Sequence, residues 1–434
     1  MCRSIDATRV RAEEVAHLSL ILGRYLLISG ADTTRVQDAV ERFASGLGFQ
    51  CHLLIQYEAL LLTVISDEDG EVRTRIGAHV AAMAVDMSAV RELYEVADDA
   101  AAGRLDVASA KARLSAIEPA GGRPIYPGWV VAGAMGLTAA SLSRLFGCDA
   151  PVFVVTFLAG TAAMLAQRQL RRVGVQPLAA TFASALTGAL VGGLGTRVLP
   201  GAAPELCLIA PGMILVPGVP LINGISDAIH YNISLALARL TSGLLVVAAI
   251  ALGLFAAAML TGIAIPATGA TPLMPIGQDM AFSALASIGF TFLFNVTGGS
   301  RLVWACIICG LCSHSLRTAL MHCGLDIASG TLIGSMAAGS LAHLFARRFA
   351  APPATFAFPG VVAIMPGSYA FRAVVASLEI MRLSGSTPPP LLAQTLSLVI
   401  STILLTAAIA VGLAIPLSRR LPSAIKAQLP GDSA

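Results

Sequence analysis

The most regular feature of this sequence is a series of long apolar runs in its last two thirds. After residue 126, ten segments are nearly free of charge, and each has about the 20 residues that a helix needs to cross a bilayer. The pattern therefore predicts ten membrane-spanning helices. Their approximate ranges are 127–146, 151–168, 177–199, 205–222, 240–264, 280–297, 302–321, 326–346, 354–376 and 391–416.

Two of these runs are interrupted in the same way. The fourth contains Pro211-Gly212 and Pro217-Gly218, and the ninth contains Pro359-Gly360 and Pro366-Gly367. Proline removes a backbone donor and clashes with the preceding turn, while glycine permits backbone angles that other residues avoid, so we expect two broken helices. Irregular backbone is tolerated at membrane depth only where protein or a water-filled cavity surrounds it. Paired interruptions in two halves of a chain are typical of a transporter's binding site.

The positions of the two interrupted runs predict how the halves are related. They are five spans apart, and an odd offset inverts the second copy in the membrane. We therefore expect two five-helix repeats, at 127–264 and 280–416, related by a pseudo-two-fold axis in the membrane plane. The loop 265–279 connects them, and a tail at 417–434 follows.

The first 120 residues follow different patterns. Apolar residues recur at steps of three and four over 13–28 and 33–47, which predicts two helices. Three strands and two further helices are predicted after them, at 49–57, 59–66, 71–76, 88–102 and 106–117. The segment 1–120 is thus expected to be an α+β domain with a small antiparallel sheet, joined to the membrane part by a linker at 121–126.

Composition and charge agree with this division. Of the 434 residues, 56% are hydrophobic and 12% are charged, against roughly 25% charged residues in soluble domains. Of the 53 Asp, Glu, Lys and Arg residues, 31 lie in positions 1–123. The net charge is only +3, and the basic residues of the membrane part stand in short clusters beside apolar runs. The lipid bilayer is therefore the expected partner, and nucleic acid is not.

The first residues lack the apolar core and cleavage site of a signal peptide, so we expect the N-terminal domain to be cytoplasmic. With ten spans, both termini are then cytoplasmic, and the Arg and Lys residues of the membrane part divide ten inside against five outside. That bias follows the positive-inside rule. The eight cysteines are scattered, and we expect no structural disulfides.

Several polar residues accompany the interrupted helices. Asn223 and Asp227 stand four apart on one helical face after the first interruption, where they could line a polar path, although Asp227 could also begin a loop. Asn295 is the counterpart in the second half. Glu205, Asp279, Asp326 and Glu379 lie at span ends, where we expect solvated side chains. His314 is expected to be a polar contact between helices.

Candidate enzyme and metal sites are weak. Ser29, Asp32, His17, His52 and His79 include the residue types of a hydrolase triad, but no local signature links them, so we expect no enzyme. A membrane-tethered hydrolase or sensor acting through the N-terminal domain is the alternative. Cys306, Cys309 and Cys312 recur every third residue, which indicates small residues packing between helices and not a metal or cluster site. No nucleotide-binding loop is present, and no cofactor is expected.

The chain resembles the threonine/serine exporters, known as the ThrE family. The resemblance rests on Ser29-Gly30-Ala31-Asp32-Thr33-Thr34-Arg35-Val36, on Phe294-Asn295 before Arg301, and on the two sets of Pro-Gly pairs. It implies a bacterial inner-membrane secondary exporter of small amino acids such as threonine and serine, driven by protons. Similar proteins split into two chains are associated with dicarboxylate export, so a succinate exporter is the alternative. The second pair also continues as Ser368-Tyr369, where the family would have more glycine.

The expected substrate pocket lies between the fourth and ninth spans, near Pro217, Gly218, Pro366 and Gly367. There, half-helix N-termini offer amides to a carboxylate, and the ends of the preceding half-helices offer carbonyls to an ammonium group. Asn223 and Asn295 would add hydrogen bonds to the substrate, and Asp227 would take up the coupling proton. The sequence leaves the oligomeric state open, and a homo-oligomer is one of the alternatives.

Overall fold

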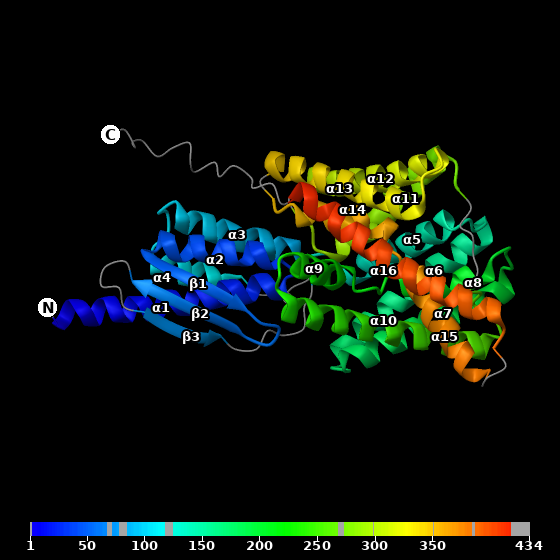
Figure 1. Cartoon of the computed structure of the whole chain (residues 1–434), viewed down its shortest axis with the longest axis horizontal. Helices are drawn as coiled ribbons and strands as arrows, with labels where there is room; N and C mark the ends of the chain where they lie inside the picture. Colours follow the sequence, from blue (N-terminus) through cyan, green and yellow to red (C-terminus); the bar gives the residue numbers. More distant parts are fainter. Residues whose placement is uncertain are drawn as a thin grey trace.

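The structure is a computed structural model that describes residues 2–66, 72–77, 85–117, 125–267, 273–297, 299–349, 351–383 and 387–417, with side chains from residue 11 onward. The chain forms an N-terminal part, which contains α1–α4 and β1–β3, and a helical part, which contains α5–α16. The two parts lie side by side along the long axis of the molecule (Figure 1). Each has its own hydrophobic core.

The N-terminal part contains the predicted helices and strands. They are α1 (Cys2–Ile28), α2 (Thr33–Gly46), β1 (Phe49–Ile55), β2 (Leu60–Ser66), β3 (Val72–Gly77), α3 (Met87–Ala101) and α4 (Val107–Ala116). The first helix is longer than its apolar stripe predicted. Asp32 and Asp86 cap α2 and α3, because each side chain accepts hydrogen bonds from two amides of the first turn.

The sheet is antiparallel in the order β1-β2-β3, with Leu53 opposite Leu62 and Val64 opposite Arg73. Residues of β1 alternate between buried and exposed, so one face of the sheet packs on the helices. The core beneath it includes Phe43 of α2 and Leu93 of α3. Alternating apolar positions thus produce a sheet with one face in the core and one face exposed.

Each predicted span corresponds to a helix or to a bent pair of helices, with ends that differ by several residues. The elements of the helical part are α5 (Gly128–Leu145), α6 (Ala150–Arg172), α7 (Pro177–Val198), α8 (Pro204–Met213), α9 (Gly218–Ile229), α10 (Ile233–Thr261), α11 (Ile276–Leu293), α12 (Ser300–His322), α13 (Ile327–Phe349), α14 (Ala354–Val361), the 3₁₀ turn η1 (Val362–Ile364), α15 (Gly367–Arg382) and α16 (Pro389–Leu417).

Within the described ranges, seven helices are long and apolar enough to cross a membrane, and nine spans result if each bent pair is one span. The chain is therefore a multi-pass helical membrane protein. The first predicted span is α5, which is 18 residues long, contains Arg144 and is not among these helices. Ten spans remain a prediction.

The two interrupted helices are broken, as expected. α8 and α9 meet at an angle of 59°, and α14 with η1 meets α15 at 50°. The first proline of each set, Pro211 or Pro359, lies inside a helix, and the chain changes direction only at Pro217 and Pro366. Each proline withholds a donor from the carbonyl four residues before it, and for Pro359 this carbonyl, Thr355 O, accepts from Cys306 Sγ at 3.3 Å instead.

Exposed side chains mark the surface that faces lipid. Large apolar residues such as Leu244 and Leu252 of α10, and Leu396 and Ile403 of α16, are exposed. The tryptophans Trp129 and Trp304 are also exposed, near the starts of α5 and α12. Tryptophans are typical of the membrane–water interface, and both lie toward the end of the helical part that contacts the N-terminal part.

Candidate functional site

The two broken helices contact each other at their breaks. An ideal Cβ placed on Gly218 would lie 2.5 Å from Met365 Sδ in the other break. A Cβ on Gly367 would lie 3.1 Å from Val216 Cγ2 in the first break. Each glycine therefore packs against the residue immediately before the proline of the opposite break. The absence of a side chain is what lets the two breaks come together.

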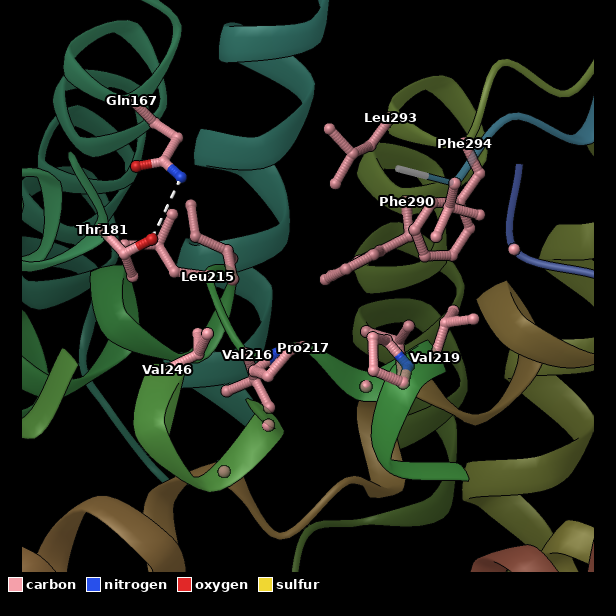
Figure 2. A pocket seen from close by; sticks show the side chains of 18 of the residues that line it. Gln167, Thr181, Leu215, Val216, Pro217, Val219, Val246, Phe290, Leu293 and Phe294 are labelled. Carbon is pink, nitrogen blue, oxygen red and sulfur yellow. Dashed lines mark hydrogen bonds between the residues drawn. The ribbon is translucent and has the colours of Figure 1, made fainter. Parts of the chain in front are cut away.

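A cavity of about 630 Å³ lies against this contact. It is lined by both breaks, by α6, α7, α10 and α11, and by residues of the N-terminal part. Figure 2 shows the polar pair Gln167 and Thr181 on one side, the rings of Phe290 and Phe294 on the other, and Pro217 between them. The volume falls in the range of about 300–1,000 Å³ that is usual for small-molecule sites.

The charged side chains that line the cavity are mainly basic. Arg239 of α10 is one of them and is paired with Asp227. The other three, Arg168, Arg171 and Arg172, come from the last turn and a half of α6, and Asp86 is the acidic lining residue. Among the described residues, no carboxylate forms an ion pair with these three arginines. The mouth of the cavity is thus suited to attract a carboxylate.

Gln167 extends this polar region toward the break. Its amide lies 2.7 Å from Ser184 Oγ and 3.3 Å from Thr181 Oγ1 (Figure 2). Rotated by 180°, the amide donates to Ser184 Oγ and its oxygen accepts from Arg171 Nε and Nη2 at 3.3 and 3.2 Å. In that orientation Gln167 holds an arginine at the wall of the cavity.

The N-terminal part covers one side of the cavity through two joints. At the first joint, Met87 N donates to Phe294 O at 2.8 Å, and Asn295 Nδ2 donates to Asp86 Oδ2 at 3.0 Å. Asn295 has a φ of +50°, so the chain leaves α11 in a left-handed turn that directs its side chain to Asp86. Gly30, Tyr57 and Val85 add further lining from this part.

At the second joint, the loop before α2 contacts α9 and α10. Asn223 Nδ2 donates to Gly30 O at 3.4 Å, and Asp227 pairs with Arg239 at 2.5 Å. Arg239 also donates to Thr33 Oγ1 at 3.0 Å, and both members of the ion pair are almost fully buried. The face of α9 that carries Asn223 and Asp227 therefore contacts the N-terminal part.

The predicted site residues thus separate into two groups. Pro217, Gly218, Asn295 and Gly367 line the cavity, and Pro366 lines a small neighbouring void. Asn223 and Asp227 are not among the lining residues of either space.

The two half-helix N-termini also differ. In α9, Gly218 N donates to Val216 O and Pro220 has no amide hydrogen, so few donors remain. In α15, which begins Gly367-Ser368-Tyr369, the first amides have no acceptor in their own helix. The start of α15 is the better anion site.

Sequence reasoning missed a buried polar cluster beside the cavity. The neighbouring void, of about 40 Å³, is lined by Asp279 of α11 and by His314, Arg317 and Thr318 of α12. Asp279 was expected to be solvated at a span end, and this is wrong, because it is 1% exposed. The spacing of His314, Arg317 and Thr318, at i, i+3 and i+4, places them on one helical face and was the available signal.

Comparison with known proteins identifies the family. Residues 17–261 match the family described as "Putative threonine/serine exporter", and residues 279–418 match the one described as "Threonine/Serine exporter, ThrE". The chain belongs to the threonine/serine exporter family. A relative from Klebsiella aerogenes, described as "Probable succinate transporter subunit YjjP", is 28% identical over 262 residues, which cover 60% of this chain and 98% of the relative. No solved structure gives a match.

Membership of the exporter family points to a transporter and away from an enzyme. Ser29 is buried whereas His17 and His52 are exposed, and no hydrogen bond between Ser29 and a histidine occurs among the described residues. His79 lies outside the described residues. Nor do any three His, Cys, Asp or Glu side chains within the described ranges form a group that could hold a metal.

Proposed function

We propose that this protein is a secondary exporter of small amino acids of the threonine and serine type, driven by protons moving the opposite way. The observation that carries the proposal is the meeting of two broken helices at the wall of a cavity of about 630 Å³. Broken helices offer free backbone amides and carbonyls to a polar substrate at membrane depth. In unbroken helices these groups are bonded to one another.

The proposed binding mode assigns one end of the cavity to each end of the substrate. The carboxylate is attracted by Arg168, Arg171 and Arg172 and binds the amides at the start of α15. The ammonium group binds carbonyls at the end of α8, near Met213 and Ile214, which line the cavity. A small side chain then lies between the break and the apolar wall that contains Phe290. Pro217, Gly218, Pro366 and Gly367 shape this site, and Asn295 closes it toward the N-terminal part.

The proposed architecture is two inverted five-helix repeats with both termini in the cytoplasm. The reciprocal contacts of Gly218 with Met365 and of Gly367 with Val216 support it, since a two-fold axis would generate such a pair of contacts. In this arrangement the cavity, covered by the N-terminal part, is the inward-facing side of the pathway. Transport follows when the breaks rearrange and expose the site to the opposite side.

A dicarboxylate is the second candidate substrate, because two observations favour it. Four arginines line the cavity, and only Arg239 among them is paired with a carboxylate in the described part of the chain. The one acidic lining residue, Asp86, is already bonded to Asn295 and to amides of α3. A matched relative is also described as a succinate transporter subunit. That relative corresponds to 60% of this chain, so the chain would unite in one polypeptide what the relative shares with another subunit.

Exchange in proteoliposomes distinguishes the candidates. Purified full-length protein is reconstituted with unlabelled threonine, serine or succinate inside, and uptake of each labelled compound is measured. We expect exchange of threonine and serine, with succinate the weaker competitor. Strong succinate exchange without threonine exchange would support the second candidate. Exchange of none of the three would contradict both. Vesicles with an Arg171→Gln protein provide a test of the site, because we expect weaker substrate affinity there.

A further inference from the structure

The buried cluster beside the cavity has the composition of a proton-binding site. His314 Nδ1 lies 2.8 Å from Asp279 Oδ1 and 3.0 Å from Oδ2. Thr318 Oγ1 donates to Asp279 Oδ1 at 2.8 Å, and Arg317 Nη2 lies 3.2 Å from His314 Nε2. The side chains of Asp279 and His314 are 2% and 5% exposed. Ionisable side chains this deeply buried in membrane helices are costly and are usually functional.

The contacts determine which nitrogen of His314 carries the proton. A guanidinium group only donates hydrogen bonds, so the contact with Arg317 requires Nε2 to be an unprotonated acceptor. The ring proton is then on Nδ1, which donates to Asp279. A second proton can bind only at Nε2, and it can do so only after Arg317 has moved away. Proton uptake is therefore tied to a displacement of Arg317.

The surroundings of the cluster permit such a movement. Tyr369 of α15 lines the same void, and the lining from α5, α13 and α16 is apolar. Arg317 Nε is buried and has no hydrogen-bond partner among the described residues. The void of about 40 Å³ exceeds the roughly 10–15 Å³ that one water molecule needs. Arg317 thus has incompletely satisfied donors beside a space that can hold water.

The cluster also lies next to the moving parts of the proposed site. Phe146, Ala363 and Met365 line both the void and the large cavity, so they form the wall between the two. Pro366, in the second break, lines the void itself. A rearrangement of this break would change the wall and the position of Tyr369 together. The charge on His314 can therefore influence which side of the wall is open.

Asp227, the residue first expected to take the proton, is in a different environment. Its partner Arg239 does not lose its proton in proteins, and both side chains are buried. Protonating Asp227 would leave the Arg239 charge unpaired, which costs several kcal/mol. At His314 the obstacle is the Arg317 guanidinium beside Nε2, and once Arg317 has moved away the added charge faces the Asp279 carboxylate. The Asp279–His314 pair is thus better suited to gain and lose a proton.

We propose that the Asp279–His314 pair carries the coupling proton of transport and that Arg317 links its occupancy to the second break. The inference rests on the proposed function. Water on the face opposite the N-terminal part supplies a proton to His314 Nε2 as Arg317 leaves, and the imidazolium pairs with Asp279. The proton then returns from Nε2 to water on the cavity side, and Arg317 resumes its contact. One proton crosses per cycle: an O–H bond of a hydronium ion breaks as the Nε2–H bond forms, and the Nε2–H bond later breaks as a water molecule on the cavity side takes the proton to form hydronium.

The first test separates coupling from exchange in proteoliposomes. We expect Asp279→Asn and His314→Gln proteins to keep threonine exchange but to lose accumulation driven by a pH gradient by at least about tenfold, in line with typical coupling energies. Asp326→Asn, which alters an exposed carboxylate at the start of α13, is the matched control and should keep both activities. Normal gradient-driven accumulation by either cluster variant would overturn the proposal.

The second test does not depend on the substrate. Nitrogen-15 NMR of the histidine-labelled full chain in nanodiscs reports the tautomer, and the His314 signal is identified by its loss from the His314→Gln protein. We expect the Nδ1–H tautomer at about pH 8 and an imidazolium signal that grows as the pH is lowered. A ring that stays neutral throughout would overturn the proposal even if transport is intact. Absence of any substrate exchange with a ring that titrates would contradict the proposed function alone.

Discussion

The contact between the two breaks makes Gly218→Ala a specific test of the transport pathway. The new Cβ would lie 2.5 Å from Met365 Sδ, whereas ordinary contacts begin near 3.4 Å, so the thioether must move by about 0.9 Å. Such overpacking costs about 1–3 kcal/mol, and the flexible methionine places this case at the lower end. If the penalty applies only while the breaks touch, it lowers the population of that conformation by about fivefold or more.

The assay is threonine exchange in proteoliposomes, normalised to the amount of inserted protein. We expect Gly218→Ala to reduce exchange about fivefold, and Gly218→Val to reduce it further because two more methyl groups must be placed. The Gly218→Ala/Met365→Ala double variant should recover most of the loss, since it removes the atom that the new Cβ meets. Gly133→Ala in α5, where a Cβ has no neighbour within 4 Å, is the control. Normal exchange by Gly218→Ala, or no recovery in the double variant, would refute the reasoning.

Three further outcomes follow from the structure. Asp227→Asn should destabilise the protein by about 3–5 kcal/mol, because the buried guanidinium of Arg239 loses its charged partner. Thermal unfolding of the detergent-solubilised protein should then show a lower midpoint than that of a Glu379→Gln control, which alters an exposed ion pair. Reporter fusions after Gly269 and after Ser384 should be periplasmic, and a cytoplasmic signal at either would contradict the inverted repeats. Burial, and secondly the nearby Glu41, raise the pKa of the Cys51 thiol to about 12. Maleimide at neutral pH should therefore label exposed Cys323 and leave Cys51 unmodified. Mass spectrometry of the labelled protein measures both.

The sequence alone was sufficient for the elements of the membrane part. A span must satisfy its backbone hydrogen bonds internally and face lipid with apolar side chains, so length and hydropathy are nearly enough to locate it. The breaks at Pro217 and Pro366 were also predictable from the sequence, since proline interrupts its own helix independently of the neighbouring helices. In the N-terminal part, the alternation of buried and exposed residues in β1 and the aspartate caps of α2 and α3 likewise depend on residues close together in the sequence.

Only the tertiary structure decided which polar residues share a site. Asn223 and Asp227 follow the first break closely in sequence, yet their helical face meets the loop at Gly30 and Thr33. Asp279, at the end of a helix where water would be expected, is covered by α12 and paired with His314. Burial, ion pairing and tautomer depend on groups that are distant in sequence, and no periodicity along one helix encodes the neighbour on the next. The apolar pattern therefore determined where the long helices lie in the chain, while the packing of helices against one another determined which polar residues come together.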